Sequence, residues 1–205
     1  MFAWDRDGAL DFAASRGFGA VVASGETGPI SSHVPFRLRR TSETLTVQFH
    51  LTARNRLAEL ADGKNPFLLI VWGPDAYVSN DWYATADHVS TWLYEAVHLS
   101  GPVRRLPIEG NRAHGDMLLS TFEERLIPKQ PWSLSAMEEE KRETMLQSII
   151  VLEMDVKKVE GQRKLNQHKC DQDHASVCRH LSASEDADAR EISAKLRALR
   201  PHLEY

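Results

Sequence analysis

Hydrophobic and polar residues alternate in the first half of the chain in the manner of half-buried β-strands. The cleanest alternation runs from residue 45 to 51, where Leu, Val, Phe and Leu occupy every second position. Because successive side chains on a strand point to opposite faces, such a segment buries one face and exposes the other. Residues 18–23 are predicted as a buried strand that ends at the turn 25–28, and residues 30–38 as a weaker alternating strand.

Further strands are expected later in the chain. They lie at residues 67–72, 76–79, 91–105 and 148–156. Gly73-Pro74 is predicted to separate the first two, and Gly101-Pro102 is predicted to interrupt the long third strand with a bulge or a bend. A polar loop is expected over residues 81–88.

Helices are predicted at the start, in the middle and at the end of the chain. The predicted segments are residues 8–16, 53–61, 109–126, 134–146 and 171–181, followed by Ile192, Leu196, Leu199 and Leu203 at helical spacing. Six or seven strands joined mostly by short turns, with helices in these places, indicate an α+β protein built on a closed antiparallel sheet. The 205 residues are expected to form a single domain, with a helical C-terminal tail from about residue 171.

Composition and charge narrow the class of protein. The chain is 42% hydrophobic and 26% charged, and its net charge of −4 makes direct DNA binding doubtful, because affinity for DNA comes largely from cationic groups on phosphates. No segment reaches the roughly 18–20 apolar residues of a membrane helix. The N-terminal residues lack an export-signal pattern, and two cysteines do not indicate a disulfide framework. We therefore expect a soluble, cytoplasmic protein with no membrane partner.

Four segments in one order carry a family resemblance. They are Ser32-His33-Val34-Pro35, the junction at residues 50–55, the Gly-Pro…Ala-Tyr…Trp-Tyr series at residues 73–83, and the Thr-Trp…Val-His series at residues 91–98, with a fainter fifth at residues 164–167. Together they span most of the chain, and the sequence resembles the PaiB-like family, described as FMN-binding negative transcriptional regulators. The chain departs from the family pattern where Arg54 is displaced by one position, Arg56 stands in place of proline, and Ser90 and Leu93 replace proline and asparagine.

The resemblance implies a split β-barrel with peripheral helices, which forms a homodimer with FMN in the cleft between subunits. The residues implied to bind the cofactor are Ser32, His33, His50, Arg54, Asn55, Arg56, Trp82, Tyr83, Trp92 and Gln167. Their chemistry suits FMN, because aromatic rings can cover the flat isoalloxazine while hydroxyl, imidazole and amide groups bond its rim or the ribityl chain. The alternatives are structural histidines on strands and tryptophans in a core or subunit interface.

The phosphate of FMN is expected at the junction around residues 49–56. A strand ending at His50 and a helix opening at Thr52–Arg54 would offer backbone N–H groups and a positive helix end. A guanidinium from Arg54 or Arg56 would add a charge-assisted hydrogen bond. The displaced arginine leaves the choice between the two open.

Histidines and cysteines gather near the C-terminus, where a zinc site is the alternative to a helix without a ligand. His168, Cys170, His174, Cys178 and His180 lie within thirteen positions, and thiols and imidazoles are the ligands of zinc. The usual Cys-x-x-Cys and His-x-x-x-His spacings are absent from the sequence, so the segment is interpreted as a surface helix and no metal is predicted.

Two functions of different class follow from the resemblance and the fold. The family description implies a regulatory flavoprotein that affects transcription. The absence of a helix-turn-helix pattern points to a protein or small-metabolite partner rather than direct DNA readout. The alternative is a small FMN-dependent oxidoreductase that uses NADH or NADPH, because one fold can host both. No residue pair has the pattern of an acid–base or nucleophile system, so no catalytic residue is named.

Overall fold

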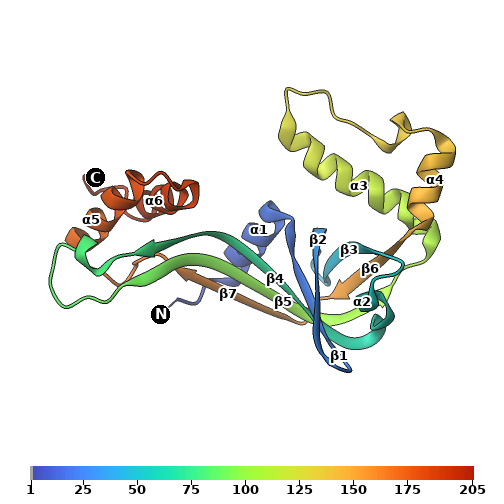
Figure 1. The fold of residues 1–205 in the computed structure, drawn as a ribbon, viewed down its shortest axis with the longest axis horizontal. Coiled ribbons are helices and arrows are strands. Elements are labelled where there is room, and N and C mark those ends of the chain that lie inside the picture. Colours follow the sequence, from blue (N-terminus) through green and yellow to red (C-terminus); the bar gives the residue numbers. More distant parts are fainter. Residues whose placement is uncertain (1) are drawn as a thin grey trace. The chain divides into compact units, whose positions relative to one another are not determined.

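The computed structural model describes residues 2–205, which form a seven-stranded sheet and six α-helices (Figure 1). The strands are β1 (Phe18–Gly25), β2 (Gly28–Arg40), β3 (Leu45–Thr52), β4 (Asp62–Val78), β5 (Thr91–Arg105), β6 (Ile149–Asp155) and β7 (Lys158–Lys164). The helices are α1 (Arg6–Arg16), α2 (Arg56–Glu59), α3 (Asn111–Glu123), α4 (Glu139–Gln147), α5 (Asp171–Ser182) and α6 (Ala187–Leu199).

The sheet closes on itself. Its order is β4-β1-β2-β3-β6-β5-β7, and a further pairing between β4 and β5 joins the ends of a six-stranded ring. Neighbouring strands run antiparallel, as in the pairs β1–β2, β2–β3 and β3–β6. This confirms the predicted α+β fold on a closed antiparallel sheet.

The chain divides into two compact units. The first, here called the barrel unit, comprises Leu10–Val71 and His98–Val159; the second, the tail unit, comprises Met1–Ala9, Trp72–Val97 and Glu160–Tyr205. Both β4 and β5 run from one unit into the other.

The core of the barrel unit follows from the alternation of its strands. Leu45, Val47 and Phe49 of β3 are buried, and the residues between them are only partly so. Phe49 lies opposite Phe36 of β2, and both side chains are fully buried. Such cross-strand pairs of large apolar side chains are the unit of stabilisation in a sheet.

Strand β5 runs from Thr91 to Arg105 without interruption, and its more and less buried residues alternate through Gly101-Pro102, so the interruption predicted there is wrong. The glycine has a different role, because a Cβ at position 101 would lie 1.9 Å from the carbonyl oxygen of Asp155. Only a residue without a side chain allows the two backbones to approach so closely.

The break predicted at Gly73-Pro74 is also wrong, since β4 runs without interruption from Asp62 to Val78. The pairing of β4 with β1 covers only Leu68–Ile70, so this edge of β4 has no β1 partner at Pro74. A proline lacks the N–H that a paired edge requires, and it is tolerated where a strand edge is unpaired.

Several helix bounds differ from those predicted. The helix expected at residues 53–61 is only α2, because the side chain of Asn55 accepts a hydrogen bond from the Leu57 N–H and starts the helix later. The two middle segments are α3 and α4 flanked by single 3-10 turns, and α6 ends at Leu199, before Leu203. Strand β7 was not predicted, because its polar sequence shows no hydrophobic face.

The core of the tail unit lies between α5, α6 and the parts of β4 and β5 in that unit. Val177 and Leu181 of α5 pack with Ile192 and Leu196 of α6, which confirms the helical spacing of the last two. Leu93 joins the same core with no exposed surface. A leucine in place of the family's asparagine therefore supplies packing here.

Candidate functional site

The predicted site residues fall into one group in each unit. Ser32, His33, His50, Arg54, Asn55 and Arg56 belong to the barrel unit; Trp82, Tyr83, Trp92 and Gln167 belong to the tail unit. Within each group the structure shows what the side chains contact.

In the barrel unit, a hydrogen bond joins β2 to the start of α2. The Asn55 side-chain NH₂ donates to the Ser32 hydroxyl at 2.7 Å, and its carbonyl oxygen accepts from the Leu57 N–H at 3.0 Å. At the other end of α2, the guanidinium of Arg105 donates to the Ala58 carbonyl at 2.9 Å. These bonds hold the short helix at both ends.

Arg54 and Arg56 flank Asn55 and are both exposed. Within residues 2–205, neither guanidinium has an ion-pair or hydrogen-bond partner. The helix that was expected to open at Thr52–Arg54 begins only at Arg56 and has four residues. The helix start predicted at Thr52–Arg54 is therefore wrong, and the two exposed guanidinium groups supply the positive charge at this junction.

His50 lies deeper in the barrel unit, where it contacts a residue that sequence reasoning missed. Its Nδ1 lies 3.0 Å from Nε2 of His114 on α3, with the two rings edge to face. Burial lowers the pKa of His50, and burial together with the neighbouring His50 lowers the pKa of His114 to about 4. Both imidazoles are therefore neutral at pH 7. In the sequence, His114 could have been noticed only as a polar residue on the buried face of the helix predicted at residues 109–126.

His33 lies on β2 across from β1. Its ring stacks on that of Phe18, with the ring centres 6.2 Å apart, and the Phe18 side chain is 47% exposed. An exposed phenylalanine beside a histidine offers a flat apolar surface to a ligand or to another protein.

The aromatic residues of the tail unit differ from one another. Trp82 stacks on His180 with ring centres 5.2 Å apart, while Tyr83 is buried, with Lys169 above its ring. Trp92 is 53% exposed and contacts the ring of Tyr77, itself 49% exposed. Of these side chains, Trp92 and Tyr77 offer the most exposed surface.

Gln167 is engaged within its own segment. Its carbonyl oxygen accepts from the Leu165 N–H at 2.7 Å, and its NH₂ donates to the Arg163 carbonyl. Both ends of the amide are used in shaping the turn after β7.

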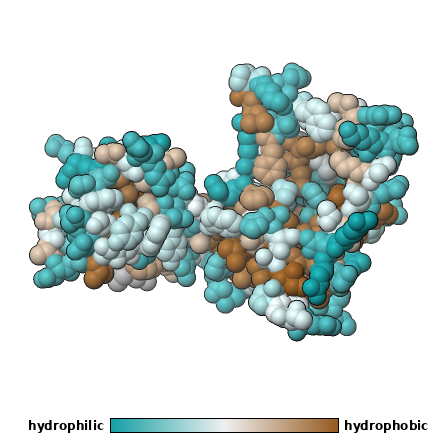
Figure 2. Space-filling view, viewed as in Figure 1, coloured by the Kyte–Doolittle hydropathy of each residue, from teal (hydrophilic) through white to brown (hydrophobic). Residues whose placement is uncertain are grey.

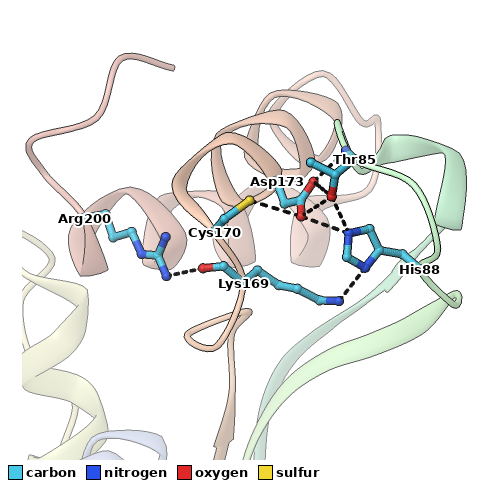
Figure 3. A network of polar contacts seen from close by, with 6 residues as sticks. All are labelled: Thr85, His88, Lys169, Cys170, Asp173 and Arg200. Atoms are coloured by element: carbon cyan, nitrogen blue, oxygen red, sulfur yellow. Dashed lines mark hydrogen bonds and ion pairs between the residues drawn. The ribbon is translucent and has the colours of Figure 1, made fainter.

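A buried polar network in the tail unit surrounds Asp173 (Figure 3). Its carboxylate accepts from the N–H and hydroxyl of Thr85, from the thiol of Cys170 and from Nε2 of His88 at 2.9 Å. Burial alone would raise the pKa of Asp173, but the hydrogen bonds from Thr85 and Cys170 outweigh it and lower the pKa to about 2. The Lys169 ammonium donates to Nδ1 of His88 at 2.8 Å. The network ties the loop after β4 to the start of α5.

Two members of the histidine and cysteine segment, His174 and Cys178, are fully buried where α5 packs against α6. His174 bonds the Leu196 carbonyl at 3.0 Å, and Cys178 lies 3.2 Å from the Ser193 hydroxyl, both between α5 and α6. Within residues 2–205 no three His, Cys, Asp or Glu side chains are grouped as metal ligands.

Comparison with known proteins places the chain in a family. The family model described as "Putative FMN-binding domain" matches residues 2–158. "Protease synthase and sporulation protein PAI 2" of Bacillus subtilis (strain 168) is 24% identical over 183 residues, 89% of this chain and 87% of the relative.

Two solved structures share the fold. The FAD and heme binding protein from Mycobacterium smegmatis has a TM-score of 0.56 at 14% identity, over 78% of this chain and 71% of that one. The flavocytochrome Anf3 from Azotobacter vinelandii has a TM-score of 0.55 at 15% identity, over 80% of this chain and 69% of that one. The likeness confirms the split-barrel fold. No helix within residues 2–205 is long and apolar enough to cross a membrane.

Proposed function

The chain belongs to the FMN-binding family whose model it matches, and we propose that it works as a cytoplasmic, homodimeric regulator of transcription of the PaiB-like kind. FMN is its cofactor, as the family implies. Its regulatory action does not depend on reading DNA sequence directly, since a net charge of −4 is unsuited to neutralising phosphates.

The residues at the start of α2 fit the phosphate end of FMN. A phosphate monoester carries about two negative charges at pH 7 and takes charge-assisted hydrogen bonds from guanidinium groups. Arg54 and Arg56 have no other partner within residues 2–205, and the Ser32 and Asn55 side chains lie beside them. The proposal that Arg54 and Arg56 hold the phosphate rests on this observation, that both guanidinium groups are unpaired.

Among the other residues predicted to contact the flavin, some are exposed and others are buried or already hydrogen-bonded. His33 with Phe18, and Trp92 with Tyr77, present exposed ring surface that a flavin ring could cover. Bound FMN supplies a redox-active ring, and the chain's own residues bind it, orient it and exclude water from it. Tyr83 and Gln167 support the cofactor only through the folding of their segments.

Exposed aromatic residues support the homodimer. Trp72, Tyr77 and Trp92 lie on the parts of β4 and β5 in the tail unit, and each is at least 39% exposed. Tyr77 and Trp92 contact each other, and exposed apolar surface of this kind marks an interaction site in soluble proteins. A twofold interface would bury the same patch on both subunits.

The regulatory function is tested in cells with a variant of the protein that is expected not to bind FMN. Transcript levels are compared between cells with the wild-type gene, cells without it, and cells with the Arg54→Ala/Arg56→Ala variant at equal protein level. The proposal expects the variant to reproduce the transcript changes of the deletion. Unchanged transcripts in the deletion strain, together with multiple turnovers of NADH or NADPH by the purified yellow protein, would instead establish an oxidoreductase.

A further inference from the structure

A cavity of about 300 Å³ lies in the barrel unit beneath α3. Its walls come from α3, from the segment between α3 and α4, from the last residues of α4, and from β2, β3 and β6; Leu118, Phe122, Trp132 and Leu134 are among the lining residues. Figure 2 shows hydrophobic residues gathered beside α3 in this part of the molecule. The volume lies at the lower end of the range of small-molecule sites, which suits a compound of one or two rings.

The lining of the cavity contains no Lys, Arg, Asp or Glu side chain. A charged ligand would lose its hydration there without gaining a counter-ion, which costs several kcal/mol. The cavity therefore does not suit the phosphate end of a nucleotide, and it selects an uncharged compound.

Two side chains of the lining carry N–H donors: the indole of Trp132, which is 41% exposed, and the imidazole of His50, whose hydrogen bond to His114 decides what it offers there. Nδ1 of His114 is buried and has no partner within residues 2–205. A buried N–H without a partner is rarer than a buried acceptor without one. His114 therefore carries its proton on Nε2 and donates it to Nδ1 of His50, so His50 carries its own proton on Nε2.

This assignment leaves the Nε2–H of His50 as a hydrogen-bond donor in an apolar site. Within residues 2–205 no acceptor engages it. A donor at the edge of an apolar pocket fixes the orientation of a ligand that has one acceptor. The complementary ligand is a small aromatic ring with one neutral oxygen acceptor.

We propose that this cavity is a binding site for an uncharged aromatic carbonyl compound, whose ring packs against Leu118 and Phe122 and whose oxygen accepts from His50. The proposal assigns His50 to this cavity instead of to FMN, for which the sequence predicted it, and it stands on the cavity and the histidine pair alone. A ligand seated there contacts both α3 and the strands beneath it. A bound ligand would thus link the helical segment at residues 108–148 to the sheet of the barrel unit.

Isothermal titration of the FMN-loaded protein with three probes of similar shape tests the proposal. Acetophenone has the ring and the acceptor, ethylbenzene lacks the acceptor, and benzoate carries a charge. Acetophenone is expected to bind saturably, about three- to tenfold more tightly than ethylbenzene, the range of one neutral hydrogen bond, with benzoate weaker than both. Saturable benzoate binding at least as tight as that of acetophenone, or no saturable acetophenone binding at millimolar concentration, would overturn the proposal.

Three variants locate the probe. Leu119→Trp places a large ring into the cavity wall and should weaken acetophenone at least tenfold, whereas Leu126→Trp, at a 54% exposed position outside the lining, should change nothing. His50→Phe should reduce acetophenone to the affinity of ethylbenzene and leave ethylbenzene unaffected. Equal acetophenone binding in Leu119→Trp and Leu126→Trp, or release of FMN by saturating acetophenone, would contradict a separate site.

Discussion

Both units carry clusters of polar side chains, but the two clusters differ in what remains unbonded. In the tail unit, Asp173, Thr85 and His88 bond one another. In the barrel unit, Arg54 and Arg56 have no partner within residues 2–205. A satisfied buried network rigidifies the fold, whereas cationic groups without partners are stabilised by an anion. We infer from this comparison that the flavin phosphate binds at Arg54 and Arg56 rather than at the densest polar cluster.

The largest expected effect concerns the arginine pair. Arg54→Ala/Arg56→Ala should weaken FMN about a hundredfold, because each hydrogen bond to a charged group contributes about 1.5–3 kcal/mol. At least one of the two single variants should bind FMN about tenfold more weakly. Riboflavin, which lacks the phosphate, should be affected little. Fluorescence titration of both flavins measures the ratio, with Arg39→Ala as a matched exposed arginine on β2. Equal losses for FMN and riboflavin would place the phosphate elsewhere.

The polar network of the tail unit should respond in stability rather than in flavin binding. Asp173→Asn replaces a 2% exposed carboxylate that accepts several hydrogen bonds, and we expect a loss of about 1–3 kcal/mol in the free energy of unfolding. Asp75→Asn, at an exposed position of β4, is the matched control. Urea unfolding measures both variants. An Asp173→Asn protein as stable as Asp75→Asn would show that the network contributes nothing.

The same carboxylate predicts a pH dependence. The pKa of Asp173 is lowered from 3.8 to about 2, so its stabilising contribution is present above pH 4 and is lost as the pH falls from about 4 to about 2. The stability difference between the wild type and Asp173→Asn should shrink over this window. A difference that stays constant down to pH 2 would contradict the lowered pKa.

His114 predicts a second window at higher pH. Its pKa falls from 6.5 to about 4 on folding, so the unfolded chain binds a proton that the folded chain does not. The stability associated with the neutral imidazole is complete above pH 6.5 and decreases as the pH falls toward 4, by an amount on the order of 1–3 kcal/mol. His114→Phe should flatten this part of the stability profile. Identical profiles for the two proteins between pH 6.5 and 4 would argue against a buried neutral His114.

The smallest effect is expected at Gln167. Because both ends of its amide bond the backbone of its own turn, Gln167→Ala should change FMN affinity by less than about twofold. Fluorescence titration under the conditions used for the arginine variants provides the measurement. A tenfold loss of FMN affinity would instead support the flavin contact that the sequence predicted for Gln167.

Local patterns in the sequence predicted most of the strands. A strand with one buried face has apolar residues at every second position, as Val47 and Phe49 of β3 show. The break at Pro74 was mispredicted, since whether a proline ends a strand depends on the pairing of its edge, which is a long-range property. Strand β7 left no hydrophobic alternation to detect.

For the site, the sequence indicated residue types but not which of them stay unpaired. Arg54 and Arg56 were candidates through the family resemblance, and only the structure shows that neither has a partner within residues 2–205. Tyr83 matched the same resemblance, yet it is buried in the core of the tail unit. His114 is far from His50 in sequence, so no spacing could have joined the two.

A crystal structure of the FMN-loaded protein tests the central claim most directly. The account predicts that a guanidinium nitrogen of Arg54 or Arg56 lies within hydrogen-bond distance of a phosphate oxygen, about 2.7–3.2 Å. It also predicts that the Asp173 network keeps the bonds it has without the flavin. A phosphate held by other residues, with both guanidinium groups turned to solvent, would contradict the account.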